Sequence, residues 1–233
     1  MIKRTMVKRT TIKRTMIKRT ISIFCLSLCA MLGAASAAEP GWTVLFDGKS
    51  LDGWRASETK STFKLVDGAL VANGTRSHLF YVGEVNGGDF ENFELKVDVM
   101  TKNNSNGGIY FHTAYQETGW PDKGFEVQVN NTYNTDPRKT GSLYAVSDTM
   151  KASASDDEWF TEHIIVQGKK VTIKVDGMTV VEWTEPADWP GLIDPANGQN
   201  FPQRKLSSGT FALQGHDPGS TIYYKNIRVK PLP

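Results

Sequence analysis

Cysteine is almost absent from this chain of 233 residues, and its two copies, Cys25 and Cys29, both lie within the first 40 positions. The remaining body has no thiol, so no disulfide can hold it together. A body of about 195 residues can bury enough apolar surface to be stable without a covalent crosslink. We therefore expect a core held by side-chain packing alone.

An excess of positive charge is also missing once the N-terminal segment is excluded. The first 20 residues contain eight Lys or Arg and no acid, which leaves 19 basic and 25 acidic residues in the rest of the chain. Affinity for a phosphate backbone comes mainly from Lys and Arg, so this balance argues against nucleic acid as a partner. Ordinary contents of aromatics, glycine and proline (10% aromatic, 21 Gly, 10 Pro) also exclude collagen, a coiled coil and a mostly disordered chain.

The N-terminal segment has the pattern of a secretory signal. A basic five-residue repeat is followed by an apolar run from Ile21 to about Ala35 and by small residues up to Ala38. We predict a signal peptide over residues 1–38 and a periplasmic or extracellular protein. The run is shorter than the roughly 20 residues of a spanning helix, so no membrane span is expected in the mature chain.

Two other interpretations of this segment remain open. The repeat is rich in Arg and Thr and lacks acids, as in a mitochondrial presequence, but the continuous apolar run after it favours export. Lipid attachment at Cys29 is the second alternative, and it is disfavoured because Leu28 occupies a position that needs a small residue.

Helical periodicity is missing from the body, which shows short alternating runs separated by turn signals instead. Asp67-Gly68 and Asp176-Gly177 predict two tight hairpins. Further strands are expected at residues 93–101, 108–113, 125–129, 142–146, 162–166, 210–214 and 222–229, and a long loop at 185–206. The pattern predicts one all-β domain over residues 39–233, a two-sheet antiparallel β-sandwich of jelly-roll type.

Alternation gives three of these strands one apolar face and one polar face. The polar set comprises Glu126, Gln128 and Asn130 on one strand, Tyr110 and His112 on a second, and Gln214 and His216 at the end of a third. Aromatic, amide and carboxylate groups in a row suit a sugar, which offers apolar C–H faces and hydroxyl groups. The alternative is that these side chains are merely the solvated face of a half-exposed sheet.

Seven sequence blocks carry a resemblance to a known family. They are residues 42–54 (WTVLFDGKSLDGW), 92–95 (NFEL), 106–111 (NGGIYF), 124–128 (GFEVQ), 140–144 (TGSLY), 213–216 (LQGH) and 225–232 (KNIRVKPL). Together they resemble the 3-keto-disaccharide hydrolase domain family and cover essentially the whole body. The resemblance implies a concanavalin-like jelly roll that acts on glycosides oxidised to a ketone at C3. The chain departs from the family at His112, where Arg is common, and at Phe160, where Asn is usual.

The residues around Glu126 bear on the mechanism. Jelly-roll glucanases use two carboxylates on one strand face, about 5 Å apart for retention. The next same-face positions here are Gln128 and Asn130, so ordinary double displacement is disfavoured. Cleavage of a 3-keto sugar does not require a second carboxylate. The ketone acidifies the C2 hydrogen, so a single base can start a β-elimination that expels the C1 oxygen.

These considerations give a set of candidate site residues. The catalytic candidates are Glu126, His216 and His112, with Glu126 or His216 as the base and with His112 and Gln128 near the enolate. The candidate substrate contacts are Gln128, Tyr110, Tyr144, Gln214 and Asn130. A divalent metal held by His112, Glu126 and His216 is the alternative way to stabilise the enolate.

Two non-catalytic hypotheses remain beside the enzyme hypothesis. The first is a carbohydrate-binding module of the same fold, with Tyr110, Tyr144 and Trp120 as stacking platforms, because fold alone does not determine function. The second is an envelope protein whose sandwich makes only protein contacts. The expected partner is thus a carbohydrate, and nothing in the sequence indicates an oligomeric state.

Overall fold

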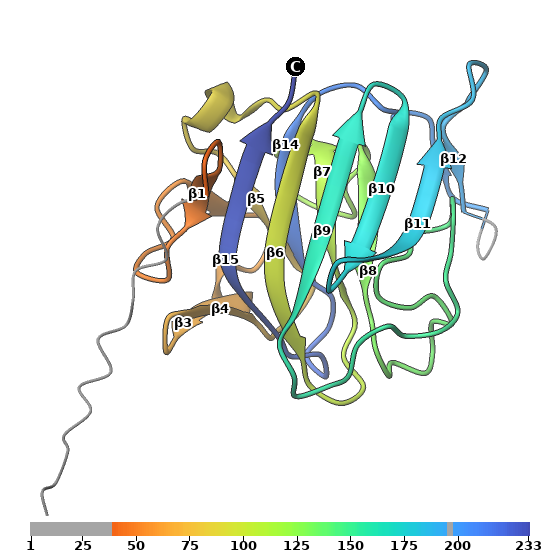
Figure 1. The fold of residues 1–233 in the computed structure, drawn as a ribbon. Coiled ribbons are helices and arrows are strands. Elements are labelled where there is room, and N and C mark those ends of the chain that lie inside the picture. Colours follow the sequence, from red (N-terminus) through yellow and green to blue (C-terminus); the bar gives the residue numbers. More distant parts are fainter. Residues whose placement is uncertain (1–38, 195–197) are drawn as a thin grey trace, which may run out of the picture. The chain divides into compact units, whose positions relative to one another are not determined.

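The computed structural model describes residues 39–194 and 198–233 (Figure 1). The signal peptide predicted for residues 1–38, with both cysteines, lies outside the described residues. Within the part that is described, no helix is long and apolar enough to span a membrane.

The described residues form strands and two short 3-10 helices. The strands are β1 (Thr43–Phe46), β2 (Trp54–Ala56), β3 (Phe63–Val66), β4 (Ala69–Ala72), β5 (Ser77–Tyr81), β6 (Phe93–Thr101), β7 (Gly107–Thr113), β8 (Phe125–Val129), β9 (Phe160–Gln167), β10 (Lys170–Val175), β11 (Met178–Thr184), β12 (Leu192–Ile193), β13 (Asn200–Phe201), β14 (Thr210–Gly215) and β15 (Ile222–Pro231). The 3-10 helices are η1 (Lys60–Thr62) and η2 (Val85–Gly88). The predicted hairpins are confirmed as β3–β4 and β10–β11.

Two antiparallel sheets face each other. The larger has the order β11-β10-β9-β6-β15-β4-β3, with β1 also paired to β15. The smaller has the order β2-β5-β14-β7-β8, and β12 and β13 form a separate two-stranded pair. Figure 1 shows β15, β6, β9 and β10 in front of β14, β7 and β8. The predicted all-β sandwich of jelly-roll type is confirmed.

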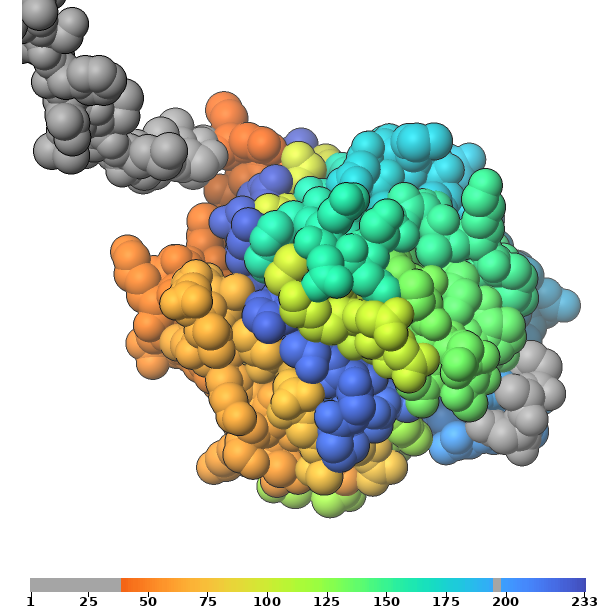
Figure 2. Space-filling view, turned by 90° about the horizontal axis from the view of Figure 1, so that it is seen from below, coloured from red at the N-terminus to blue at the C-terminus, as the bar shows by residue number. Residues whose placement is uncertain are grey.

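Segments far apart in the sequence meet in these sheets. Strand β15, near the C-terminus, pairs with β4 on one side and with β6 on the other. In the view of Figure 2 the N-terminal orange segments lie against the blue C-terminal ones. The order of strands is therefore set by long-range pairing, in which backbone groups of each strand are satisfied by remote partners.

The core lies between the two sheets and follows the expected alternation. On β6, Phe93, Leu95, Val97 and Val99 are buried, and the residues between them are half-buried. The smaller sheet contributes apolar side chains such as Val127 to the same cluster. Burial of this kind contributes roughly 25 cal/mol per Å² of apolar surface and is the main stabilising force of a chain without disulfides.

The smaller sheet differs from the larger because four of its strands are buried on both faces. Every residue of β5, β7, β8 and β14 is buried. Loops that carry Trp120 and Tyr144, together with Phe201 of β13, cover its outer face and line a cavity there with the strand residues. The polar face predicted from alternation is therefore not a solvated surface, and its polar groups are enclosed.

Two local expectations are wrong. Residues 142–146 form turns in place of a strand, because only Leu143 makes bridges, to Val127 and Ser147. On β7 the alternation breaks at His112, which has a φ of +54°. The pairing with β14 shifts by one residue there, between Thr210 and Ala212, as in a β-bulge.

Candidate active site

A cavity of about 180 Å³ lies on the outer face of the smaller sheet. Strand residues form its floor and three loops form its walls. Its lining residues are Asn106, Tyr110, Trp120, Glu126, Gln128, Asp136, Tyr144, Asp194, Gln199, Phe201, Arg204, Gln214 and His216. Six of the eight residues predicted from the sequence as site residues are among them, and His112 and Asn130 are not.

Glu126 on β8 is held in a fixed orientation at the floor of this cavity. The Tyr110 hydroxyl donates to its Oε2 at 2.6 Å, and the Gln214 amide donates to its Oε1 at 2.7 Å. The carboxylate lies over Gly108 of β7, where a Cβ atom would approach Oε1 to 2.4 Å. Glycine at position 108 therefore provides the space that Glu126 occupies.

Burial dominates the electrostatics of this carboxyl group. Glu126 is only 6% exposed, and burial raises its pKa, although the Arg204 cation and the hydrogen bonds from Tyr110 and Gln214 oppose this shift. Burial also raises the pKa of Tyr110 well above its ordinary value, so its hydroxyl keeps its proton and acts as a donor. Glu126 can thus hold and release a proton at a higher pH than an exposed glutamate.

His216 follows the last residue of β14 and also lines the cavity. Its Nδ1 lies 2.7 Å from Asp217 Oδ2, and the same oxygen accepts a hydrogen bond from the Ser220 hydroxyl. Burial opposes ionisation of Asp217, but the hydrogen bonds from His216, Ser220 and the Gly219 amide outweigh it and lower the Asp217 pKa. An Asp217 carboxylate that accepts from Nδ1–H leaves the lone pair of His216 on Nε2, as a base requires.

Arg204 brings a buried cation to the same cavity. It is 3% exposed, and its guanidinium lies 4.0 Å from the ring centre of Phe201. One terminal nitrogen donates to the Pro121 carbonyl, and within the described part of the chain Nε has no hydrogen-bond partner. The sequence did not identify Arg204, because it lies in the long loop 185–206, where no periodic pattern indicates which side chains point inward.

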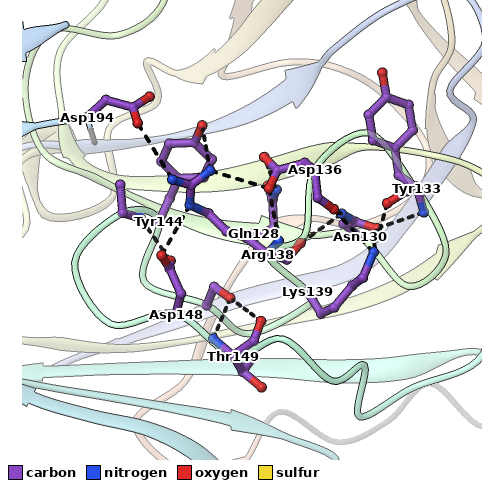
Figure 3. A network of polar contacts seen from close by, with 12 residues as sticks. Gln128, Asn130, Tyr133, Asp136, Arg138, Lys139, Tyr144, Asp148, Thr149 and Asp194 are labelled. Carbon is purple, nitrogen blue, oxygen red and sulfur yellow. Dashed lines mark hydrogen bonds and ion pairs between the residues drawn. The ribbon is translucent and has the colours of Figure 1, made fainter. Parts of the chain in front are cut away.

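A second cation, Arg138, organises one wall of the cavity (Figure 3). Its guanidinium contacts Asp136 at 3.4 Å, Asp148 at 3.1 Å and Asp194 at 3.6 Å. It also lies 4.4 Å from the centre of the Tyr144 ring. Asp136 and Asp194 line the cavity and Asp148 does not. This arrangement was not predicted either, because its members lie on loops.

The placement of His112 with Glu126 and His216 is wrong. Because of the bulge, its ring leaves the cavity face and packs against Phe93 and Phe111, at centroid distances of 5.7 and 5.3 Å. Its Nε2 lies 2.8 Å from the Glu91 carbonyl, and its Nδ1 accepts from the Ser207 amide at 3.2 Å. Burial lowers its pKa to about 4, so it is a neutral histidine that links strand and loop.

Asn130 does lie on the predicted face, but it does not line the cavity. Its amide donates to the carbonyls of Asp136 and Arg138, and its Oδ1 accepts from the Tyr133 amide. Asn130 therefore holds the loop that carries Asp136, and the structure does not place it among the cavity-lining residues as predicted.

The three residues named as candidate metal ligands do not fit one ion. Both ring nitrogens of His112 are engaged by backbone groups outside the cavity, away from Glu126 and His216. Among the described residues, no group of three or more His, Cys, Asp or Glu side chains is arranged to hold a metal ion. We therefore derive no step through a metal.

The fold and the cavity define a jelly-roll domain of the carbohydrate-active type. Residues 41–230 match the family of 3-keto-alpha-glucoside-1,2-lyase-like domains, and the chain belongs to this family. The family resemblance inferred from the sequence blocks is thereby confirmed.

Solved structures share this fold. A Parabacteroides distasonis protein provisionally named a glycosyl hydrolase is 25% identical, with a TM-score of 0.67 over 83% of this chain and 94% of its own. A second protein of that organism with the same provisional name is 22% identical, with a TM-score of 0.64 over 82% of this chain and 99% of its own. The Crh5 transglycosylase shares the fold at 15% identity, with a TM-score of 0.53 and coverage of 83% and 85%. The comparison with curated proteins returned no significant match.

Proposed function

We propose that this domain cleaves glycosides that carry a ketone at C3, by proton abstraction at C2 and elimination of the group at C1. One observation carries the proposal: Glu126, His216 and Arg204 line the same cavity in a chain of the lyase-like family. A base, a proton donor and a cation are the three groups that such an elimination needs.

In the first step His216 acts as the base. Its Nε2 takes the C2 hydrogen, and the electron pair of that bond moves to form C2=C3, with negative charge on the ketone oxygen. Asp217 stabilises the imidazolium that forms, through its short contact with Nδ1. Arg204 supplies positive charge for the enolate oxygen, and its buried Nε, unpartnered among the described residues, is available as a donor.

In the second step the enolate collapses and the bond between C1 and the glycosidic oxygen breaks. A C1=C2 double bond forms next to the restored ketone, and the leaving oxygen takes a proton from Glu126. The raised pKa of Glu126 suits this role, since the group must be protonated before the step. Addition of water across C1=C2 then yields the free 3-keto sugar.

The side chains of β8 support elimination over double displacement. A retaining displacement requires a second carboxylate about 5 Å from Glu126. The same-face neighbours of Glu126 are the amides Gln128, on β8, and Asn130, which directly follows β8. The carboxylates Asp136 and Asp194 line the cavity but form ion pairs with Arg138.

The test compares a 3-keto glucoside with its parent glucoside, with and without a chelator. We expect cleavage of the keto sugar alone, and the chelator arm reports whether a metal takes part. Glu126→Gln keeps the shape of the side chain and removes its acid. It should lower kcat by about 10²- to 10⁴-fold and leave the circular dichroism spectrum unchanged. Unchanged turnover would contradict the assigned role of Glu126.

A carbohydrate-binding module is the second candidate, because the aromatic rings of Trp120 and Tyr144 both line the cavity. Such a module binds unmodified sugars as well as oxidised ones and releases no product. Its affinity should change only modestly in Glu126→Gln. Calorimetry with the parent glucoside, run beside the cleavage assay, separates the two candidates.

We also propose that the domain works outside the cytoplasm, on the basis of the signal-like pattern of residues 1–38. N-terminal sequencing of the protein recovered from the exported fraction tests this. A mature chain that starts at Ala38 or Glu39 supports export, and recovery of the uncleaved chain from the cytoplasm alone contradicts it.

A further inference from the structure

We propose that a second groove, separate from the cavity of Glu126, binds one neutral, unoxidised sugar unit. The groove lies where β5 and β7 end and β14 begins, at Tyr81, Thr113 and Thr210. The connections β5–β6 and β7–β8 complete its walls. The inference goes beyond the proposed cleavage reaction, because none of the residues that line this groove takes part in that reaction.

The groove and the cavity are two different sites. Within the described part of the chain they share no lining residue. On β7, Thr113 of the groove lies three residues beyond Tyr110 of the cavity, which corresponds to about 10 Å along the strand. The groove is open and has a volume of about 320 Å³, which lies within the range of small-ligand sites.

One hydroxyl group of the groove is buried without a partner. Thr113 is 1% exposed, and its Oγ1 makes no hydrogen bond within the described residues. Its partner across the strands is Thr210, which donates its hydroxyl hydrogen to the Tyr81 carbonyl at 2.6 Å and is left as an acceptor. An unpartnered buried hydroxyl costs free energy, and a ligand with several hydroxyl groups can bond to both threonines.

The groove also holds one positive and one negative group, both anchored on Ser208. Lys123 Nζ donates to the Ser208 carbonyl at 2.7 Å, and Asp89 Oδ2 accepts from the Ser208 hydroxyl at 3.1 Å. The ammonium group has three hydrogens and the carboxylate two oxygens, so each retains capacity for a ligand. Hydroxyl groups accept from the ammonium and donate to the carboxylate. An anion is repelled by Asp89 and a cation by Lys123, so the pair favours a neutral ligand.

Apolar side chains lie beside these polar groups. Val82 lines the groove and is 49% exposed. The Tyr115 ring also lines it and is held in place, with the Phe80 ring centre at 5.3 Å and the Arg55 guanidinium at 3.8 Å. A pyranose ring has apolar C–H faces and hydroxyl groups that both donate and accept. It therefore matches both kinds of surface, and a small inorganic ion does not.

The experiment is an NMR titration of the purified protein with cellobiose, an unoxidised neutral disaccharide. The amide signals of Gly83 and Gly88 report on the groove, and the indole signal of Trp120 reports on the cavity. We expect the two glycine signals to shift in a saturable way and to give a dissociation constant of their own. Sugar that binds only in the cavity shifts the Trp120 signal and leaves both glycine signals in place, which would overturn the inference.

Two variants identify the groups that bind the sugar. Thr113→Val removes the hydroxyl and keeps the shape, so it should weaken binding in the groove about tenfold. It should not lower the melting temperature, because the hydroxyl has no partner to lose in the free protein. Lys123→Met keeps the aliphatic stem and should also weaken binding about tenfold. Asp122→Asn is the matched control, because Asp122 adjoins Lys123 without lining the groove.

The outcomes decide both the site and the class of ligand. Weaker binding in Thr113→Val and Lys123→Met, with an unchanged dissociation constant in Asp122→Asn, supports the inference. Equal binding in all three variants and the wild type overturns it. Inorganic phosphate and glycine are titrated in parallel as an anion and a zwitterion. If either binds the groove more tightly than cellobiose, the groove selects charge and the assignment of a neutral sugar is wrong.

Discussion

Replacing Gly108 by alanine tests whether the position of Glu126 controls activity. The added Cβ would meet Glu126 Oε1 at 2.4 Å and Cγ at 2.8 Å. Ordinary contact begins at 3.4 Å, so the carboxylate must move by about 1 Å, away from the hydroxyl of Tyr110 and the amide of Gln214. Gly108 is not among the residues with positive φ, so alanine is compatible with the backbone there.

A displacement of about 1 Å in a catalytic group can lower the rate by about 10²-fold. We therefore expect Gly108→Ala to lose about two orders of magnitude in kcat/KM for a 3-keto glucoside, with a stability loss of about 1–3 kcal/mol from overpacking. Turnover and urea unfolding measured on the same preparation separate the two effects.

The control is Gly168→Ala, in the turn between β9 and β10. Gly168 has a φ of +58° and open space where its Cβ would be, so alanine costs about 1–2 kcal/mol of strain far from the cavity. This variant should lose stability and keep its activity. If Gly108→Ala retains wild-type kcat/KM, the assignment of Glu126 as a positioned proton donor is wrong.

Two further predictions concern buried titratable groups. His112→Asn should retain kcat but lose about 1–3 kcal/mol of stability at neutral pH, because the backbone contacts of the ring are lost. Burial lowers the pKa of His112 to about 4, so the stability that the neutral ring contributes is present above pH 6.5 and is lost as the pH falls toward 4. In His112→Asn, the unfolding free energy measured with urea should therefore fall less steeply over this acid range. Glu162 faces the core without a side-chain hydrogen-bond partner among the described residues, and burial raises its pKa well above the ordinary value. The stability that protonated Glu162 contributes is therefore present below pH 4.5 and is lost as the pH rises through the raised pKa of this group. Glu162→Gln should flatten the fall in unfolding free energy between about pH 5 and pH 8, and an unchanged slope would show that another group causes it.

The floor of the site could be predicted from the sequence because alternation is reliable within regular strands. Glu126, Gln128 and Tyr110 lie on the cavity face of β7 and β8, as a period of two requires. The same rule failed at His112, where one residue with positive φ shifts the register, and histidine does not by itself indicate a bulge. The rule also could not show that the polar face is enclosed, because the covering loops have no periodicity.

The charged residues of the site walls could not be predicted from the sequence, whereas Trp120 and Tyr144, which also lie on the covering loops, were named from it. Arg204, Asp136 and Asp194 come from loops, and their positions depend on contacts with segments distant in sequence, such as the bond from Arg204 to the Pro121 carbonyl. Of the charged site residues that were not predicted, only Asp217 could have been found from its position in the sequence, because it directly follows the candidate His216. The resemblance in sequence blocks identified the family, since those blocks include the strands that form the floor.

Solvent exchange at C2 tests the central claim most directly. A 3-keto glucoside is incubated with the purified domain in heavy water, and the recovered sugar is analysed by proton NMR. The account predicts that deuterium enters at C2 of the 3-keto sugar product, and that Glu126→Gln, which retains the base His216, still exchanges C2 of unreacted substrate while it forms little product. Product that keeps its original hydrogen at C2 would contradict abstraction at that carbon and indicate displacement at C1.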